Sequence, residues 1–582
     1  MSGAAGGLRP ALEELIRTAR GDAPADLVLR GGRVVDVFSG EVLEADVAVL
    51  GDRVAGVGEG YEGRSELDCS GRWIAPGFLD GHMHVESSLV TLPQFARAVV
   101  PRGTVGAVLD PHEIANVHGV DGVRWILESR RGLPFHAFVT ASSCVPATPL
   151  ETSGAELDAE DLAGLLEEEG VLGLAEMMNF PGTVAGDPGV LEKLQAARER
   201  GMTVDGHAPG LTGRALNAYL AAGPGSDHEA TTLEEAREKL RKGMRVMIRE
   251  ASTARNLEDL LPLVTPANAR RCSLVTDDRH PHDLLGEGHL DHAVRKAIRL
   301  GLDPVTAVAM ASLNTAEWFG LDRRGFGAVA PGWRADLLVL SDLEAVEVER
   351  AYVGGRLAAR GGEMAVDVPD APSGLPPSVR VDPDAHPGFR IPAEGRHVRV
   401  IEVVPGQIVT GAAEAEAALA DGEAVADTGR DLLKLAVVER HGRGGGTGLG
   451  FVRGFGLEAG ALGSSVAHDA HNVILAGADD ASMRTALRGV AETDGGLVAA
   501  RGEELLARLP LPVAGLMSDR PVEEVRDALD DLQRACRELG GTLDSPYMAL
   551  SFLALAVIPS LKLTDRGLVD VDRFELVDLW VG

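Results

Sequence analysis

Short apolar runs broken by glycine and aspartate predict β-strands on both sides of a long central segment. Runs at residues 26–37 and 45–57 are each interrupted by a Gly-Gly or Gly-Asp pair, and similar runs return at 335–340 and 351–356. Because glycine and aspartate adopt the backbone conformations of tight turns, we expect the first two runs to form hairpins. We further expect the early and late strands to pair into one small β domain that flanks the central segment.

The central segment alternates short apolar runs with helical patterns such as those at residues 191–200 and 232–242. Several of the apolar runs end in a histidine or an acid. Strands and helices that alternate over about 200 residues, with polar groups at the strand ends, are typical of a (β/α)8 barrel, which gathers functional groups at the carboxyl ends of its strands. The predicted fold class is therefore α/β, with a distorted barrel of the TIM type.

The rest of the chain predicts a linker and a further domain. Seven prolines and few large apolar residues between 369 and 392 indicate a linker or an irregular crossover. Strand-like runs at 398–404 and 432–438 and a helical pattern at 522–539 predict a C-terminal α+β domain. We place the boundaries as follows: an N-terminal helix and the first part of the β domain at 1–74, the barrel at 75–321, the second part of the β domain at 322–368, the linker at 369–396 and the C-terminal domain at 397–582.

Composition narrows the class of partner. The 582 residues include 88 acidic and 56 basic side chains, which gives a net charge of -32. So acidic a surface argues against nucleic-acid and anionic-membrane partners, although it does not identify a substrate. The four cysteines are scattered without a Cys-x-x-Cys pair, which fits a reducing compartment. We expect no secretory leader, a cytoplasmic location and a homo-oligomer.

Side chains that bind metals close several of the apolar runs. They are His82, His84, Glu176, His207, His228 and Asp277. Alternate residues of a strand point to the same side, so the first two histidines can reach one ion. Each histidine taken alone is more readily a satisfied or exposed side chain, but their joint placement at strand ends favours a metal centre. Imidazole and carboxylate ligands suit Zn, Mn or Fe(II), and this set is large enough for a pair of ions about 3.5–4 Å apart.

The motifs around these residues resemble the amidohydrolase superfamily and, within it, the bacterial adenine deaminase family. The resemblance is carried by residues 81–88, 110–116, 175–179, 205–210, 226–229 and 276–280, and in the last domain by 454–456, 466–472 and 511–518. Many superfamily members bridge their metals with a carboxylated lysine. This chain has no lysine between Pro76 and Lys193, so Glu176 is the expected bridge and the lysine-bridged branches are disfavoured.

The resemblance implies hydrolytic deamination of free adenine to hypoxanthine and ammonia, as in purine salvage. It implies a divalent metal cofactor, two ions per chain, with Mn(II) or Fe(II) favoured and Zn(II) as a chemically suitable alternative. The implied metal ligands are His82, His84, Glu176, His207, His228 and Asp277. Asp277 would also relay a proton from the attacking water to the leaving group, with Asp278 as the alternative ligand should Asp277 face away.

An acid must also protonate ring nitrogen N1, and the resemblance offers Glu113 and His112 for this catalytic role. Glu86 and Asn179 are expected to contact the substrate. For Glu86 the competing interpretation is an acid in the first turn of a helix, and for Glu113 a carboxylate that orients a ligand histidine. Residues 468–472 either reach over the barrel mouth or form a local turn.

Two other functions stay open at this point. The same metal centre on a different ring, such as a guanine, a pterin or a cyclic amide, is the nearest alternative, because the ligands set the reaction type and the pocket sets the ring. The second is a barrel that has lost catalysis and serves as a scaffold. A scaffold has little reason to keep a complete set of metal-type residues, so an enzyme is favoured.

Overall fold

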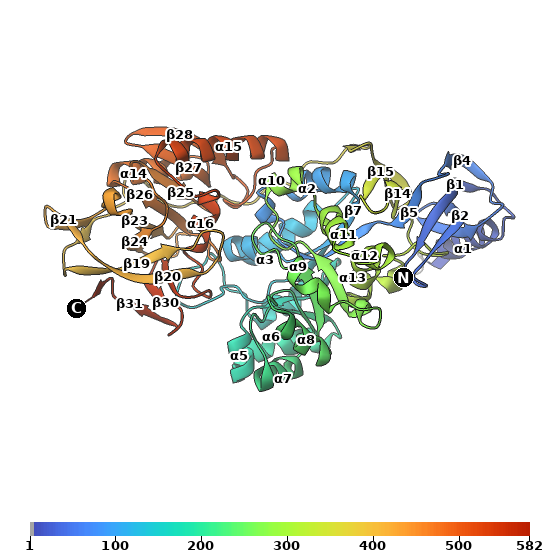
Figure 1. Ribbon diagram of the computed structural model, residues 1–582, viewed down its shortest axis with the longest axis horizontal. Coiled ribbons are helices and arrows are strands. Elements are labelled where there is room, and N and C mark those ends of the chain that lie inside the picture. The colour runs from blue at the N-terminus through green and yellow to red at the C-terminus, as the bar shows by residue number, and fades with distance from the viewer. Residues whose placement is uncertain (1–4, 582) are drawn as a thin grey trace.

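The computed structural model describes residues 5–581, with side chains from residue 11 onward. Figure 1 shows a barrel in the middle, a β domain at the end that contains β1 and β2, and the C-terminal domain at the opposite end. The barrel strands are β6 (Phe78–Met83), β7 (Thr104–Leu109), β8 (His136–Ala141), β9 (Val171–Met177), β10 (Thr203–Gly206), β11 (Ser226–Asp227), β12 (Arg245–Arg249) and β13 (Cys272–Val275).

The barrel closes through two short parallel sheets. Strands β6 to β10 form one sheet and β11 to β13 form the other. The backbone N–H of Gly225 donates to the carbonyl of Val204 at 3.1 Å, and that of Asp277 donates to the carbonyl of His82 at 3.0 Å. At these two junctions between the sheets, isolated hydrogen bonds replace continuous strand pairing, so the barrel is distorted. The predicted fold class is confirmed.

Helices surround the barrel strands, and local capping explains where they begin. Asp187 accepts a hydrogen bond from the N–H of Val190 at 3.1 Å, and Pro188 occupies the first helical position, so α6 begins a few residues before the predicted range. The helices are α2 (Leu92–Val99), α3 (His112–Ser129), α4 (Ala159–Leu165), α5 (Phe180–Ala185), α6 (Pro188–Glu199), α7 (Gly213–Ala222), α8 (Leu233–Arg241), α9 (Leu257–Leu260), α10 (Pro281–Gly286), α11 (Leu290–Arg299), α12 (Pro304–Met310) and α13 (Leu313–Trp318).

The flanking β domain combines strands from before and after the barrel. Strand β5 pairs antiparallel with β14, which joins the early and late strands into one sheet, as predicted from the sequence. The elements are α1 (Ala5–Ala19), β1 (Ala25–Asp36), β2 (Glu41–Leu50), β3 (Arg53–Gly58), β4 (Gly63–Asp68), β5 (Trp73–Pro76), β14 (Leu337–Asp342), β15 (Glu347–Val353), β16 (Arg356–Arg360) and β17 (Glu363–Met364).

The expected hairpin at the first Gly-Gly pair is wrong. Strand β1 continues through Gly31 and Gly32, and its pairing with β2 is only shifted there by a bulge. Gly31 takes φ +60°, and a Cβ on Gly32 would lie 2.5 Å from Cδ1 of Ile74. The glycines therefore admit a bulge and a close neighbour. The turn between β1 and β2 lies at residues 37–40, whereas the expected Gly51-Asp52 hairpin joins β2 to β3.

The proline-rich segment 369–396 is irregular apart from the two-residue strand β18 (Ile391–Pro392). It nevertheless packs against the C-terminal domain. Phe389 is fully buried in an apolar cluster of that domain, and the N–H of Arg380 donates to the carbonyl of Arg440 at 2.8 Å. The segment is thus a fixed crossover along the domain surface, which is one of the two forms expected from its composition.

The C-terminal domain contains a large mixed sheet with helices. The strand order is β20-β19-β24-β23-β26-β25-β27-β28, with β32 paired to β19. Its elements are β19 (His397–Val403), β20 (Thr410–Glu416), β21 (Ala418–Ala420), β22 (Glu423–Val425), β23 (Leu433–Val438), β24 (Thr447–Arg453), β25 (Ala461–Ser464), β26 (Val473–Gly477), α14 (Asp480–Ala491), β27 (Gly496–Arg501), β28 (Glu504–Pro510), α15 (Val522–Glu538), α16 (Pro546–Phe552), β29 (Leu561–Thr564), β30 (Gly567–Asp570), β31 (Glu575–Val577) and β32 (Trp580–Val581).

The C-terminal domain is docked on the barrel through a shared apolar core. One cluster of buried side chains includes Phe78 and Leu109 from the barrel and Leu435 and Met517 from the C-terminal domain. The N–H of Ser518 also donates to the carbonyl of Leu89, in the loop after β6, at 2.8 Å. This docking covers the strand ends of the barrel. Among the described helices, none is long and apolar enough to span a bilayer.

Candidate metal-dependent active site

The two histidines of the His-x-His motif lie at the end of β6 and are held through their Nδ1 atoms. Nδ1 of His82 lies 3.0 Å from Oδ2 of Asp205, and Nδ1 of His84 donates to the carbonyl of Asp110 at 2.9 Å. These contacts leave both Nε2 atoms directed into the barrel mouth. Such partners fix ring orientation and increase the basicity of the free nitrogen.

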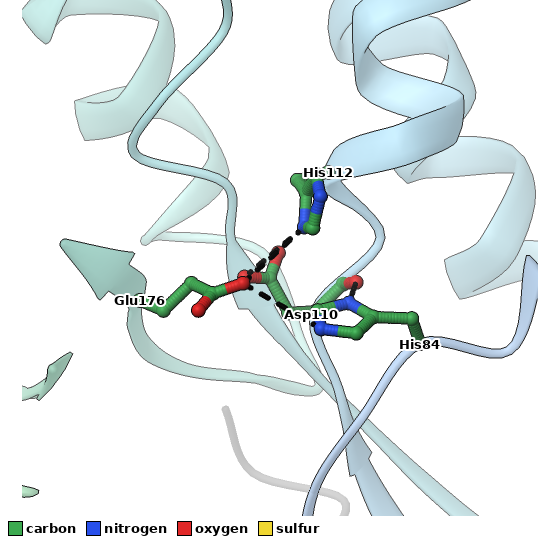
Figure 2. Close-up of side chains that lie close together, drawn as sticks. All are labelled: His84, Asp110, His112 and Glu176. Carbon is green, nitrogen blue, oxygen red and sulfur yellow. Dashed lines mark hydrogen bonds and ion pairs between the residues drawn. The ribbon is translucent and has the colours of Figure 1, made fainter. Parts of the chain in front are cut away.

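Glu176 occupies the centre of the site, at the end of β9. Its Oε2 lies 2.6 Å from Nδ1 of His207 and 3.2 Å from Nε2 of His228, while its Oε1 lies 3.5 Å from Nε2 of His84. Figure 2 shows the same carboxylate between His84 and His112, with Asp110 beside them. One carboxylate therefore contacts imidazoles from three barrel strands or their loops, as a bridging ligand would.

Asp277 reaches the same group of side chains from the loop that follows β13. Its Oδ1 lies 3.2 Å from Nε2 of His84 and 3.9 Å from Nε2 of His82, and its Oδ2 accepts a hydrogen bond from Nη1 of Arg249 at 2.7 Å. Burial alone would raise the pKa of Asp277, but Arg249 and His84 hold it well below its usual range. Asp277 is thus ionised at neutral pH. Asp278 faces Ser87 instead, whose hydroxyl donates to it at 2.5 Å.

The donor atoms fit a divalent-metal centre. His82, Glu176 and His228 form one set, and His82, His84 and Asp277 form another, in which the ligand atoms lie within 4.8 Å of one another. Nε2 of His82 is buried without a hydrogen-bond partner in the described part of the chain, although buried polar atoms are normally paired. An imidazole and carboxylate set of this kind suits Zn, Mn or Fe(II).

The structure also brings residues into the site that the sequence did not single out. Asp110 follows β7, Glu229 follows His228, and Arg249 is the last residue of β12. Nη2 of Arg249 donates to Oε2 of Glu229 at 3.2 Å, so this guanidinium joins two carboxylates of the site. Their position at carboxyl ends of barrel strands was a usable signal. Arg249 was not a candidate, because a guanidinium cation does not bind metal ions.

A second group of acids lies beside the metal-type residues. Glu113 and His112 begin α3, and Oε1 of Glu113 lies 3.4 Å from the hydroxyl oxygen of Ser87. Burial, and then the neighbouring carboxylates of Glu86 and Asp278, raise the pKa of Glu113 well above its usual range. Its surroundings therefore favour the protonated form of Glu113, in contrast to Asp277.

The two residues expected to contact substrate are engaged in helix caps. Oε1 of Glu86 accepts a hydrogen bond from the N–H of Ile114 at 3.2 Å, in the first turn of α3. Oδ1 of Asn179 accepts from the N–H of Gly182 at 2.9 Å and caps α5. Neither side chain lines the cavity over the metal-type residues. Glu86 lies close enough to Glu113 to raise the pKa of Glu113.

The C-terminal domain forms part of the active-site wall. An inner cavity of about 80 Å³ lies over Glu176 and Asp277, and its lining includes His468, Asp469 and Phe552. The sequence left open whether residues 468–472 reach the barrel, and the structure places the beginning of this motif at the barrel mouth. An outer cavity of about 460 Å³ adjoins the inner one and leads to the surface between the two domains.

Known families match both large domains. Residues 73–358 match the amidohydrolase family, and residues 407–575 match the adenine deaminase C-terminal domain. The adenine deaminase of Desulfatibacillum aliphaticivorans is 52% identical over 571 residues, which cover 98% of this chain and 99% of that protein. Those of Cereibacter sphaeroides (strain ATCC 17025 / ATH 2.4.3) and Nitratidesulfovibrio vulgaris (strain DP4) are 50% and 48% identical and cover 98% of this chain and 100% of their own length. With metal-type residues, barrel and C-terminal domain all in place, the chain belongs to the adenine deaminase family within the amidohydrolases.

Proposed function

We propose that this chain hydrolyses free adenine to hypoxanthine and ammonia. The observation that carries the proposal is a single buried site that combines a metal-type ligand set around Glu176 with two carboxyl groups whose pKa values are moved in opposite directions. Deamination requires both forms, because an ionised group must accept a proton from water and a protonated group must donate one to the ring. Family membership supplies the choice of adenine as the ring.

We propose two divalent ions per chain, Mn(II) or Fe(II) in preference to Zn(II). His82, His84, Glu176, His207, His228 and Asp277 would hold them, with Glu176 between the two. When bound, the ions would make hydroxide available near neutral pH and stabilise the charge that develops during attack.

Asp277 is the proposed proton relay. Water adds to C6 of adenine, and the exocyclic amino group leaves as ammonia. Asp277 accepts one proton from the attacking water and passes it to that amino group, which makes ammonia the leaving group. The second water proton leaves the C6 hydroxyl as the carbonyl forms and replaces the proton that Glu113 gives to N1. The guanidinium of Arg249, 2.7 Å from Oδ2, keeps the carboxylate ionised before the first transfer and fixes its orientation for both.

Glu113 is the proposed acid for ring nitrogen N1, which gains electron density as water adds to C6. A carboxyl group whose pKa is raised by burial and neighbouring acids is suited to donate its proton at this step. His112 is the second candidate for this role, because its Nδ1 lies 3.6 Å from Oε1 of Glu176 and is buried without a hydrogen-bond partner in the described structure.

We also propose the wider setting of the activity. A cytoplasmic purine-salvage role is supported by four free, buried cysteines, which suit a reducing compartment. A homo-oligomer and the absence of nucleic-acid and membrane partners remain proposals from size and acidity. We propose the domain limits 1–74, 75–321, 322–368, 369–396 and 397–582.

Turnover of free adenine by metal-stripped protein, before and after Mn(II), Fe(II) or Zn(II) is restored, tests the proposal. The loss of adenine absorbance and the release of ammonia should both require metal. Guanine, a pterin and a cyclic amide are assayed in parallel. Metal-dependent turnover of one of those rings with none of adenine would keep the metal centre and reject the adenine assignment, and inertness towards every ring would reject the enzyme.

A further inference from the structure

A loop of the C-terminal domain supplies a side chain that contacts the candidate acid. Nδ1 of His468 lies 3.3 Å from Oε1 of Glu113, and Oδ1 of Asp469 lies 4.0 Å from Nε2 of His112. Both loop residues are buried, and both line the inner cavity. The C-terminal domain therefore touches the catalytic end of α3, beyond covering the barrel mouth.

The position of His468 is fixed from several sides. Its backbone N–H donates to the carbonyl of Ser551 at 3.1 Å, and its ring stacks on that of Phe552 with centroids 4.8 Å apart and an angle of 15°. Nearby, Nδ2 of Asn472 donates to the carbonyl of Thr152 in the barrel at 2.9 Å. The backbone hydrogen bond and the stacking on Phe552 restrict the ring of His468, so its Nδ1 is held beside Glu113.

The carboxyl group of Glu113 lies beside other acids, which disfavour its charged form. Its acidic neighbours are Glu86 and Asp278, and across the described residues His468 is the single Lys, Arg or His side chain with a nitrogen within 4.0 Å of it. The hydroxyl oxygen of Ser87 lies 3.4 Å from the same oxygen, Oε1, but its proton points to Asp278, whose Oδ1 is 2.5 Å away. A donor at Oε1 would leave the carboxyl proton on Oε2.

We propose that His468 is a positioning residue for the deamination: its Nδ1–H donates to Oε1 of Glu113 and so keeps the acidic proton of Glu113 on Oε2, ready for the ring of the substrate. The inference rests on the proposed function and deepens it. Burial lowers the pKa of His468 to about 4, so the imidazole is neutral and carries one N–H. A neutral ring donates a hydrogen bond without removing the proton that Glu113 must deliver.

His468 has a second role in this proposal, as a wall for the planar base. The inner and outer cavities share Thr253, Asp278, His468 and Phe552 in their linings. The stacked pair of His468 and Phe552 therefore lies where a base passes from the outer cavity to the metal-type residues. Flat aromatic faces at this point favour a flat ring by stacking.

Two substitutions separate the hydrogen bond from the wall. His468→Phe keeps a ring on Phe552 but removes the donor, so we expect kcat for adenine to fall about 10–100-fold with little change in KM. His468→Asn keeps a donor close to the position of Nδ1 but removes the ring, so we expect kcat within about fivefold of the wild type and a KM raised about 3–10-fold. His386→Gln, at a half-buried histidine remote from the cavities, is the matched control and should leave both constants unchanged.

Metal content and unfolding midpoint are measured on all variants, and both should match the wild type. Wild-type kcat in His468→Phe, or equal losses of kcat in both variants, would overturn the positioning role. Loss of bound metal or of folded protein in both variants would assign His468 to structure and overturn it as well. In each of these cases an active wild-type enzyme leaves the proposed function standing, whereas a wild-type protein inert towards adenine would reject that function and this inference with it.

Discussion

At the residue scale, the site shows how neighbours give one type of side chain opposite tasks. Asp277 and Glu113 are both buried carboxyl groups, and burial favours the protonated form of each. Arg249 reverses that preference at Asp277, whereas Glu86 strengthens it at Glu113. Two carboxyl groups whose pKa values are moved apart in this way can act as base and acid in one reaction at one pH.

The relay role of Asp277 predicts a separation of activity from structure. In Asp277→Asn the amide keeps one oxygen and the hydrogen-bonding shape but cannot carry the proton. We expect kcat to fall by at least about 10³-fold while the fold and most of the bound metal are retained. Steady-state kinetics and elemental analysis of the purified variant measure the two quantities. Near-normal turnover, or a protein without metal, would remove Asp277 from this role.

At the element scale, helices lock the loops that carry the ligands. Lys239 on α8 is fully buried, and its Nζ donates to the carbonyl of Ala208 at 2.7 Å and to the carboxylates of Asp227 and Glu235 at 2.8 and 2.7 Å. Ala208 and Asp227 adjoin the candidate ligands His207 and His228. One buried ammonium thus sets the spacing of two loops at the barrel mouth.

Removal of this ammonium should affect both stability and metal binding. Lys239→Met leaves two buried carboxylates without their cation, which costs about 3–5 kcal/mol in the free energy of unfolding. We expect metal affinity to fall as well, because His207 and His228 lose their alignment. Lys242→Met, which removes a partly exposed pair with Glu238 and a hydrogen bond to the carbonyl of Gly213, is the control and should cost much less. Urea unfolding and metal titration report the two effects; equal behaviour of the two variants would contradict this account.

Asp336, just before β14, links the β domain to the barrel and predicts a pH dependence. Burial alone would raise its pKa, but His136 at 3.0 Å, then Arg334 and the N–H of Gly354, lower it. A carboxyl group whose pKa is lower in the folded protein stabilises it above its unfolded pKa, and that stabilisation is lost as pH falls through the folded pKa.

We therefore expect Asp336→Asn to destabilise the protein by about 1–3 kcal/mol at pH 7, since a buried charge-assisted contact is lost. The difference from the wild type should shrink as pH falls below about 4, where the wild-type carboxyl group also becomes protonated. Unfolding midpoints of both proteins between pH 3 and pH 8 test this. A difference that stays constant over this range would show that Asp336 contributes through shape and not through charge.

At the scale of the whole molecule, the barrel and the metal-type residues could be predicted because each ligand follows a strand in the sequence. His82 lies in β6 and His84 directly after it, Glu176 lies near the end of β9, and His207 and Asp277 follow β10 and β13. Arg249 could not be assigned in the same way, because its role depends on a contact with Asp277 that forms only in the folded protein. The placement of His468 could not be predicted either, since it depends on how an entire domain packs. The Gly31-Gly32 bulge resembled a turn because glycine permits both.

The central claim is that one buried site, with two metal ions held around Glu176, deaminates adenine. The most direct measurement is a titration of metal-free protein with Mn(II) in which adenine turnover is followed. The account predicts that activity rises with added Mn(II) and levels off near two equivalents per chain. Full activity at one equivalent, or no adenine turnover at any amount of metal, would contradict it.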